Sequence, residues 1–61
     1  METYKGSALW NAIEWTTEKS AHEFRRPFIL RAIENWEKRK DENQVSFFKE
    51  ALAHLDKKLG V

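Results

Sequence analysis

The chain has no cysteine, one proline and two glycines among its 61 residues. Without cysteine there are no disulfides and no thiolate metal ligands, which often support domains of this size. The same absence fits a reducing compartment, so we expect a cytoplasmic protein. Because proline and glycine are the main turn formers, their scarcity disfavours a β-rich fold and favours helices.

Long apolar runs and a strong net charge are also missing. No run approaches the roughly 18 apolar residues of a membrane-spanning helix, and the polar start of the chain lacks the apolar segment of a signal peptide. Although 34% of the residues are charged, the net charge is only +1. This balance is typical of a solvated surface, so we expect no membrane association.

Helical periodicity is the main positive signal, and it predicts one all-α domain of three short helices. Residues 1–6 are interpreted as a leader, and the helices are expected at about 7–24, 27–39 and 43–59. The third helix is the most regular, with large apolar residues at intervals of three and four. These are Val45, Phe48, Leu52, Leu55 and Leu59.

Capping residues mark several helix ends. The Ser7 hydroxyl is suited to cap the first helix, and Asp41 or Asn43 is suited to cap the third. Gly60 follows the last apolar position of the third helix, where glycine usually ends a helix. Since the loop around residues 40–43 is short, the second and third helices should be antiparallel neighbours.

The boundary between the first two helices has more than one interpretation. Pro27 disfavours a helical conformation for Arg26 but suits a first helical turn, so we place a break at Arg25–Arg26. A capping-box pattern from Ser20 to Glu23 would instead begin a helix at Ser20. The third alternative is a helical hairpin whose first helix is kinked at Pro27, at a cost of about 3 kcal/mol unless packing compensates.

The stretch from Arg25 to Trp36 is the densest apolar segment. Ile29 and Ile33 share one helix face, while Phe28 and Leu30 lie outside it. A helix that is apolar on most sides is usually buried on more than one side. We therefore expect this stretch to form the central helix, against which both flanking segments pack.

The apolar side chains exceed what three short helices can bury. The chain has three tryptophans and four phenylalanines. Clustered exposed aromatics mark interaction surfaces, and tryptophan is enriched at interface hot spots. We predict a protein partner or a second copy of the chain, with a homo-oligomer as the first candidate. The residues assigned to this interface are Trp10, Trp15, Phe28, Leu30 and Phe47.

A cluster of basic residues around the second helix supports an alternative, a small nucleic-acid-binding regulator. Its two ends would lie roughly 20 Å apart on one helix, enough to reach separate phosphates. Against it, the third helix carries Glu50 and Asp56, and the net charge is far below that of most such proteins. The six candidate residues are Arg25, Arg26, Arg31, Lys38, Arg39 and Lys40.

No residue pattern indicates chemistry. His22 and His54 have no second histidine at metal-ligand spacing, and each is interpreted as a solvated partner of a glutamate one turn earlier, Glu18 or Glu50. A glycine-rich phosphate loop is missing, and no serine has an adjacent base. We therefore predict a non-enzymatic protein without metal or cofactor, which self-associates or inhibits or bridges a larger partner.

Overall fold

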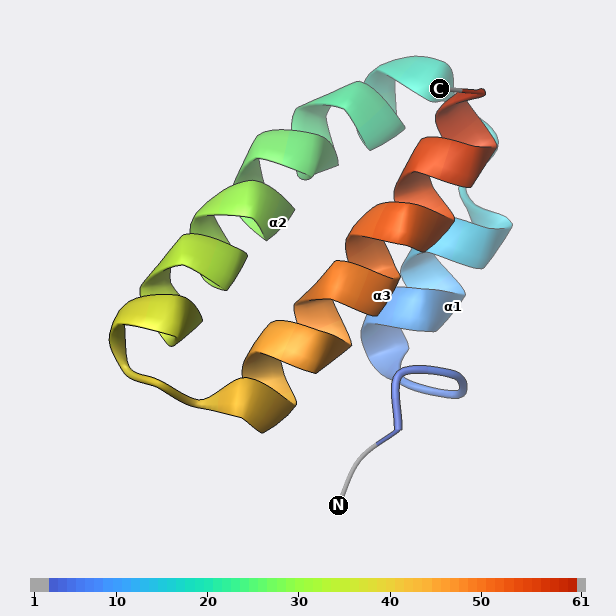
Figure 1. Ribbon diagram of the computed structural model, residues 1–61. Coiled ribbons are helices and arrows are strands. Elements are labelled where there is room, and N and C mark those ends of the chain that lie inside the picture. Colours follow the sequence, from blue (N-terminus) through green and yellow to red (C-terminus); the bar gives the residue numbers. More distant parts are fainter. Residues whose placement is uncertain (1–2, 61) are drawn as a thin grey trace.

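The computed structural model describes residues 3–60 and consists of three α-helices joined by short loops (Figure 1). Helix α1 spans Ala8–Trp15, α2 spans Lys19–Lys38 and α3 spans Glu42–Leu59. No β-strand occurs within residues 3–60, so the predicted all-α, three-helix fold is confirmed. None of these helices is long and apolar enough to cross a membrane.

The first helix is shorter than predicted, because it ends at Trp15 and not near residue 24. Thr16 adopts an extended backbone, with φ −80° and ψ 125°, and its hydroxyl donates a hydrogen bond to the carbonyl of Ala12. Threonine loses side-chain freedom in a helix, and its hydroxyl offers the backbone an alternative partner. These properties of Thr16 and Thr17 explain why α1 ends here.

The predicted break at Arg25–Arg26 is wrong, since α2 continues through Pro27 to Lys38. Proline removes one backbone bond, the one to the carbonyl of Glu23, at a cost of about 3 kcal/mol. Glu23 and Pro27 are both exposed, so water can reach the free carbonyl. The burial of Ile29 and Ile33 farther along the same helix offsets the remaining cost.

The helix start predicted at Ser20 is close to the observed one but differs in its cap. Helix α2 begins at Lys19, and the preceding Glu18 makes no side-chain capping bond. Ser20 therefore lies inside the helix, and the predicted capping box with Glu23 is not formed.

The expected caps of the other helices are confirmed. The Ser7 Oγ accepts a hydrogen bond from the N–H of Trp10 at 3.1 Å and so caps α1. Helix α3 begins at Glu42, one residue earlier than predicted.

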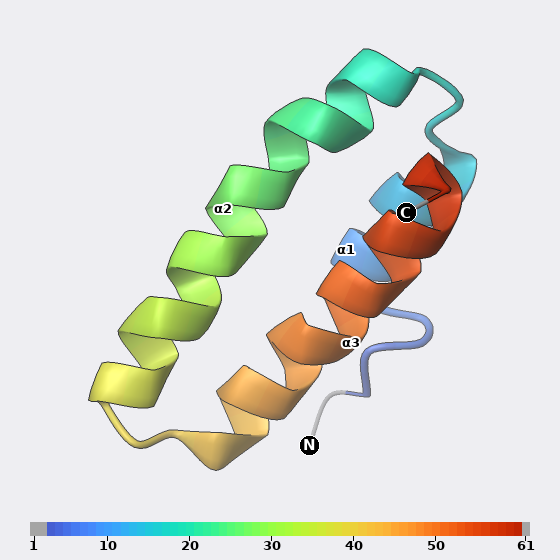
Figure 2. The same cartoon turned by 45° about the horizontal axis from the view of Figure 1, so that its top comes forward.

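Both ends of α3 follow the sequence signals. The Asp41 carboxylate accepts a hydrogen bond from the N–H of Gln44 at 3.2 Å. Gly60 ends the helix in the left-handed conformation with φ 78°, which glycine adopts without steric cost. Figure 2 shows α2 and α3 side by side and running in opposite directions, so the predicted antiparallel pair is confirmed.

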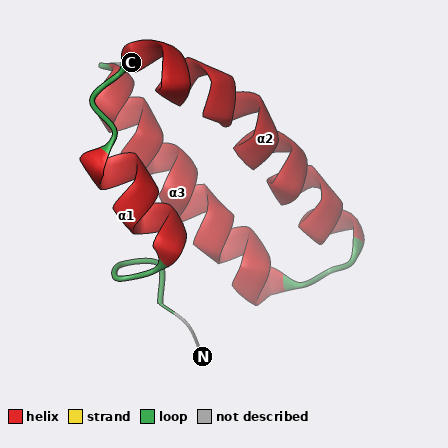
Figure 3. Cartoon of the chain, turned by 180° about the vertical axis from the view of Figure 1, so that it is seen from behind, coloured by secondary structure: helices red, strands yellow, loops and turns green. Residues whose placement is uncertain are grey.

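The central element is α3 and not the stretch from Arg25 to Trp36. Helix α3 packs against both other helices, whereas α1 and α2 make only marginal contact. Figure 3 shows the same arrangement from behind, with α1 and α2 on different sides of α3. Helix α1 has only 8 residues, too few to cover two neighbours. The buried apolar core is formed by Tyr4, Ile13, Ile29, Ile33, Ala51 and Leu55.

Candidate functional site

Helix α2 has a solvent side that carries large apolar side chains. Phe24 is 70% exposed and Phe28 is 61% exposed, and their ring centroids lie 5.4 Å apart. They are four residues apart, so they are neighbours on one face of the helix. Exposed aromatic pairs are rare on surfaces that contact only water, which makes this pair a candidate interaction site.

We define the outer face of α2 as the solvent-facing row that contains this pair. Its members recur at intervals of three and four, which places them on the opposite side of the helix from the buried Ile29 and Ile33. All are exposed. The row therefore combines two aromatic rings with two cations and two neutral polar groups. The outer face of α2 consists of Ser20, Phe24, Phe28, Arg31, Asn35 and Lys38.

The five residues predicted to form a partner interface lie in different places. Trp15 is 77% exposed, at the end of α1, and Leu30 is 41% exposed, on α2 but beside the outer face. Trp10 and Phe47 are half-buried and pack against the core. Of the five, only Phe28 belongs to the outer face of α2.

Phe24 is the large exposed residue that the sequence interpretation missed. Its spacing of four from Phe28 was a usable signal. The predicted break at Arg25–Arg26 places the two residues in different helices. Once α2 continues through Pro27, Phe24 and Phe28 fall on the same face.

A second candidate region is a chain of hydrogen bonds between the leader, α3 and α1. The His54 Nδ1 lies 2.6 Å from the Tyr4 hydroxyl oxygen, and the His54 Nε2 lies 2.8 Å from the Glu14 Oε2. The Lys58 Nζ is 3.2 Å from the same carboxylate oxygen. We call these four residues the Tyr4–His54 network.

The pKa of Tyr4 bears on which groups of the network can donate. Burial, with smaller contributions from Glu50 and Glu14, raises this pKa to about 12, so the hydroxyl keeps its proton and can donate to His54 Nδ1. In the tautomer that carries its proton on Nε2, His54 donates to the Glu14 carboxylate. Hydrogen bonds from His54 and Lys58 lower the pKa of Glu14 and favour its charged form.

The arrangement of hydroxyl, imidazole and carboxylate has the connectivity of a nucleophilic triad. However, a nucleophilic hydroxyl needs a lowered pKa or ready loss of its proton, and the pKa of Tyr4 is raised. Tyr4 is also buried. The geometry suits a structural connection that holds the leader and α1 against α3.

Both histidines contradict their predicted places as solvated partners of nearby glutamates. His22 is only 3% exposed, and its Nε2 lies 3.0 Å from the carbonyl of Thr16. His54 bonds to Tyr4 and Glu14, not to Glu50. Each histidine joins segments that local spacing does not bring together.

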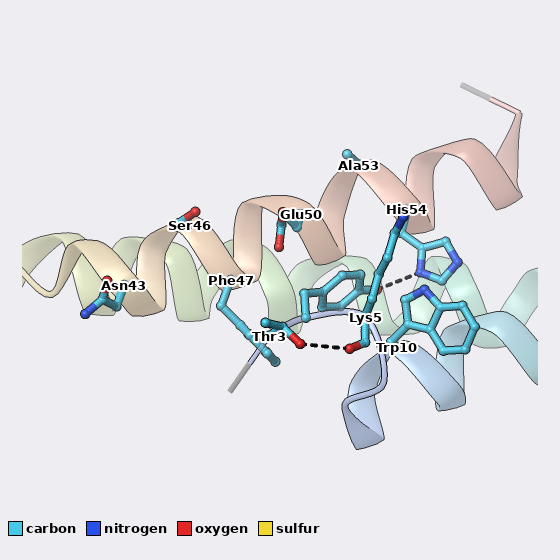
Figure 4. Close-up of a pocket in the computed structure, with 10 residues that line it drawn as sticks. Thr3, Lys5, Trp10, Asn43, Ser46, Phe47, Glu50, Ala53 and His54 are labelled. Carbon is cyan, nitrogen blue, oxygen red and sulfur yellow. Dashed lines mark hydrogen bonds between the residues drawn. The ribbon is translucent and has the colours of Figure 1, made fainter. Parts of the chain in front are cut away.

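An open groove of about 550 Å³ runs beside the network, between the leader and α3 (Figure 4). Trp10 and Phe47 contribute to its lining, together with Lys5 and Glu50. The Trp10 ring stacks on that of His54, with centroids 5.8 Å apart and an angle of 22° between the planes. Trp10 therefore both lines the groove and packs over His54 in the network.

The six basic residues predicted to contact nucleic acid do not form one surface. By helical spacing Arg25 and Arg26 lie toward the core side of α2, while Arg31 and Lys38 lie on its outer face. Three of the six also contact side chains of the chain itself, in the pairs Arg26–Asp56, Lys38–Glu34 and Arg39–Trp36.

Within residues 3–60, no group of three or more acidic or histidine side chains is placed to hold a metal ion. Two features of this part of the chain could carry a function, namely the outer face of α2 and the groove beside the Tyr4–His54 network. Comparison with protein-family models, curated proteins and solved structures gives no match to this chain.

Proposed function

We propose that this chain is a small interaction protein that docks on a protein partner through the outer face of α2. The observation that supports this is the Phe24–Phe28 pair, in which two touching rings are both more than half exposed. The pair lies on the longest helix, away from α3. In this proposal the protein is not an enzyme, and it regulates by self-association or by inhibiting or bridging its partner.

The energetic reason is the apolar area that remains in water. Burying one large apolar side chain contributes roughly 1.5–3 kcal/mol. Because Phe24 and Phe28 are mostly exposed in the monomer, they contribute little of this burial energy there. A partner that covers both rings gains most of it, and aromatic residues fixed on a helix lose little conformational freedom when they bind.

The alternative function, nucleic-acid binding, has weaker support. A phosphate-binding surface needs several cations that face the same way. Arg26 is instead paired with Asp56, with 2.8 Å between Nε and Oδ1. Arg39 is stacked on Trp36, with its guanidinium carbon 5.3 Å from the ring centroid.

Photo-cross-linking tests the docking proposal. A photoreactive phenylalanine analogue at position 28 should give a protein adduct in cells that express the chain. The same analogue at position 49, where exposed Lys49 lies on α3, is the matched control. Equal adduct yields from the two positions, or adducts to nucleic acid alone from position 28, would overturn the proposal.

Salt dependence separates the two candidate functions once an adduct is found. Contacts to phosphate weaken steeply with added salt because counterions are released on binding, whereas burial of aromatic rings does not. We expect the adduct yield from position 28 to stay nearly constant from about 50 mM to about 500 mM salt, because added salt does not weaken the burial of apolar groups. A loss of most of the adduct over this range would favour nucleic acid.

A further inference from the structure

We propose that the partner at the outer face of α2 is the same face of a second copy, packed antiparallel about a two-fold axis that passes close to Phe28. This inference rests on the proposed docking function and names its occupant. It follows from the order of residue types along the face, which is self-complementary in one direction only.

The register of such a pair follows from helix geometry. In two antiparallel helices related by a two-fold axis, residues at the same height have numbers with a constant sum. With the axis between residues 27 and 28, that sum is about 55. Phe28 then lies beside Phe28 of the second copy, and Phe24 lies opposite Arg31 of the second copy.

Each of these contacts is favourable. Two phenylalanine rings that meet at the axis bury area and can adopt an edge or offset arrangement. An arginine over a phenylalanine ring makes a cation–π contact. Near the ends of the face Ser20 lies opposite Asn35 of the second copy, so neutral polar groups meet each other. Because of the symmetry, every contact away from the axis occurs twice.

Charge at the edge of the face selects the same direction. Glu23 is exposed and lies beside the outer face, within one residue, a rise of about 1.5 Å, of the height of Arg31 of the second copy in this register. The antiparallel pair therefore gains two Glu23–Arg31 attractions. In a parallel pair, Arg31 would lie beside Arg31 near the middle of the face, and these like charges would repel, while Glu23 would lie on opposite sides of the pair and have no arginine opposite it.

A second copy also suits the size of the chain. A domain of 61 residues buries only about 60% of the surface that its unfolded form exposes, so its stability is marginal. A two-fold pair covers the same patch on both copies and leaves no complementary surface free for further addition. The pair of α2 helices would then form the centre of a six-helix dimer.

Charge reversal with rescue tests the register. Glu23→Arg and Arg31→Glu each create two like-charge contacts in their own homodimer. In an equimolar mixture, one copy supplies two arginines and the other supplies two glutamates, so both contacts become attractive again. Both positions are exposed in the monomer, so the substitutions should leave the fold intact, which helical circular dichroism verifies.

Sedimentation velocity on the full chain provides the measurement. We expect the unaltered chain to dimerise, each single variant to dimerise at least about tenfold more weakly, and the mixture to regain dimers of mixed composition. Lys49→Glu on α3 is the matched control and should dimerise as the unaltered chain does. Dimers that are equally strong in all variants, or no recovery in the mixture, would overturn the register.

The outcome also separates this inference from the docking proposal. If the unaltered chain stays monomeric at all concentrations while position 28 cross-links to another protein, the self-pairing is wrong and the docking function stands. If position 28 cross-links to no protein, both are wrong. An adduct of two copies of this chain that disappears in Glu23→Arg and returns in the mixture supports both.

Discussion

The Tyr4–His54 network and the outer face of α2 use similar aromatic residues in opposite ways. On the first, Tyr4 is buried and Trp10 is half-buried against His54, and each polar group of the network meets a partner within the chain. On the second, Phe24 and Phe28 touch each other but remain in water. The first region is complete in one copy, whereas the second gains its stabilisation only when something covers it.

The difference arises from what each element packs against. Helix α1 is short and packs mainly on α3, and the hydrogen bonds of His54 join Tyr4 and Glu14 to that helix. Helix α2 is already anchored by Ile29 and Ile33 on its core side. Its opposite side is therefore free to carry residues that do nothing for the monomer. Substitutions in the two regions should have unequal effects on folding.

The largest expected effect is in the network, at His54. Replacing His54 with Ala removes the ring that Trp10 stacks on and leaves Tyr4 and Glu14 without their central partner. Orphaned polar groups cost about 1–3 kcal/mol, and lost packing adds to this. We expect the free energy of unfolding, measured by urea denaturation, to fall by about 2–4 kcal/mol.

The control for this substitution is Lys57→Ala, three positions along α3 and exposed. It should change the free energy of unfolding by less than about 0.5 kcal/mol. If His54→Ala were as mild as this control, the network would contribute nothing to stability, and the contrast between the two regions would fail.

The next effect concerns Pro27, in the middle of α2. Because the helix runs through this position, Pro27→Ala restores the backbone bond to Glu23. Helix propensity favours Ala by about 3 kcal/mol. The greater conformational freedom of the unfolded chain with Ala offsets roughly 0.4–1 kcal/mol of this gain. We expect a net stabilisation of about 2 kcal/mol in urea denaturation. Destabilisation would instead support the helix break that the sequence first suggested.

The Pro27 case shows where sequence reasoning succeeds and where it fails. The number of helices and the caps at Ser7, Asp41 and Gly60 are local features, and local chemistry determines them. A break at Pro27 is also a local preference, but the burial of Ile29 and Ile33 outweighs it. Local signals are therefore reliable where no strong tertiary interaction opposes them.

The network could not be predicted from spacing. Its hydrogen bonds join His54 to Tyr4 and Glu14, which are 50 and 40 residues away in sequence. Only the packing of α1 on α3 brings them together. The outer face of α2 was partly predictable, since Phe28 was identified from the excess of apolar residues, and Phe24 would have followed from an unbroken helix.

A smaller effect is expected from Tyr4, and it depends on pH. Tyr4→Phe removes one hydrogen bond and should cost about 1 kcal/mol at pH 7. The folded pKa of Tyr4, about 12, lies above the ordinary value of 10.0. The folded state therefore holds its proton more tightly, and this contribution is full below pH 10 and lost between pH 10 and 12.

The advantage of the unaltered chain over Tyr4→Phe should therefore shrink as the pH rises from 10 to 12. Urea denaturation of both proteins across this range provides the measurement. Lysine titration affects both chains equally and cancels in the difference. A difference that stays constant up to pH 12 would mean that the Tyr4 hydroxyl ionises as easily in the folded chain as in the unfolded one.

The smallest effect on the monomer is expected from Phe28→Ser. Phe28 is 61% exposed, so its loss removes little buried area, and serine has about the same helix propensity as phenylalanine. At concentrations low enough to keep the chain monomeric, the free energy of unfolding should change by less than about 1 kcal/mol. A loss comparable to that of His54→Ala would mean that Phe28 supports the core, and that the two regions do not differ in kind.

At high concentration the same substitution should remove the concentration dependence of the melting temperature, because the associated state that stabilises the folded chain no longer forms.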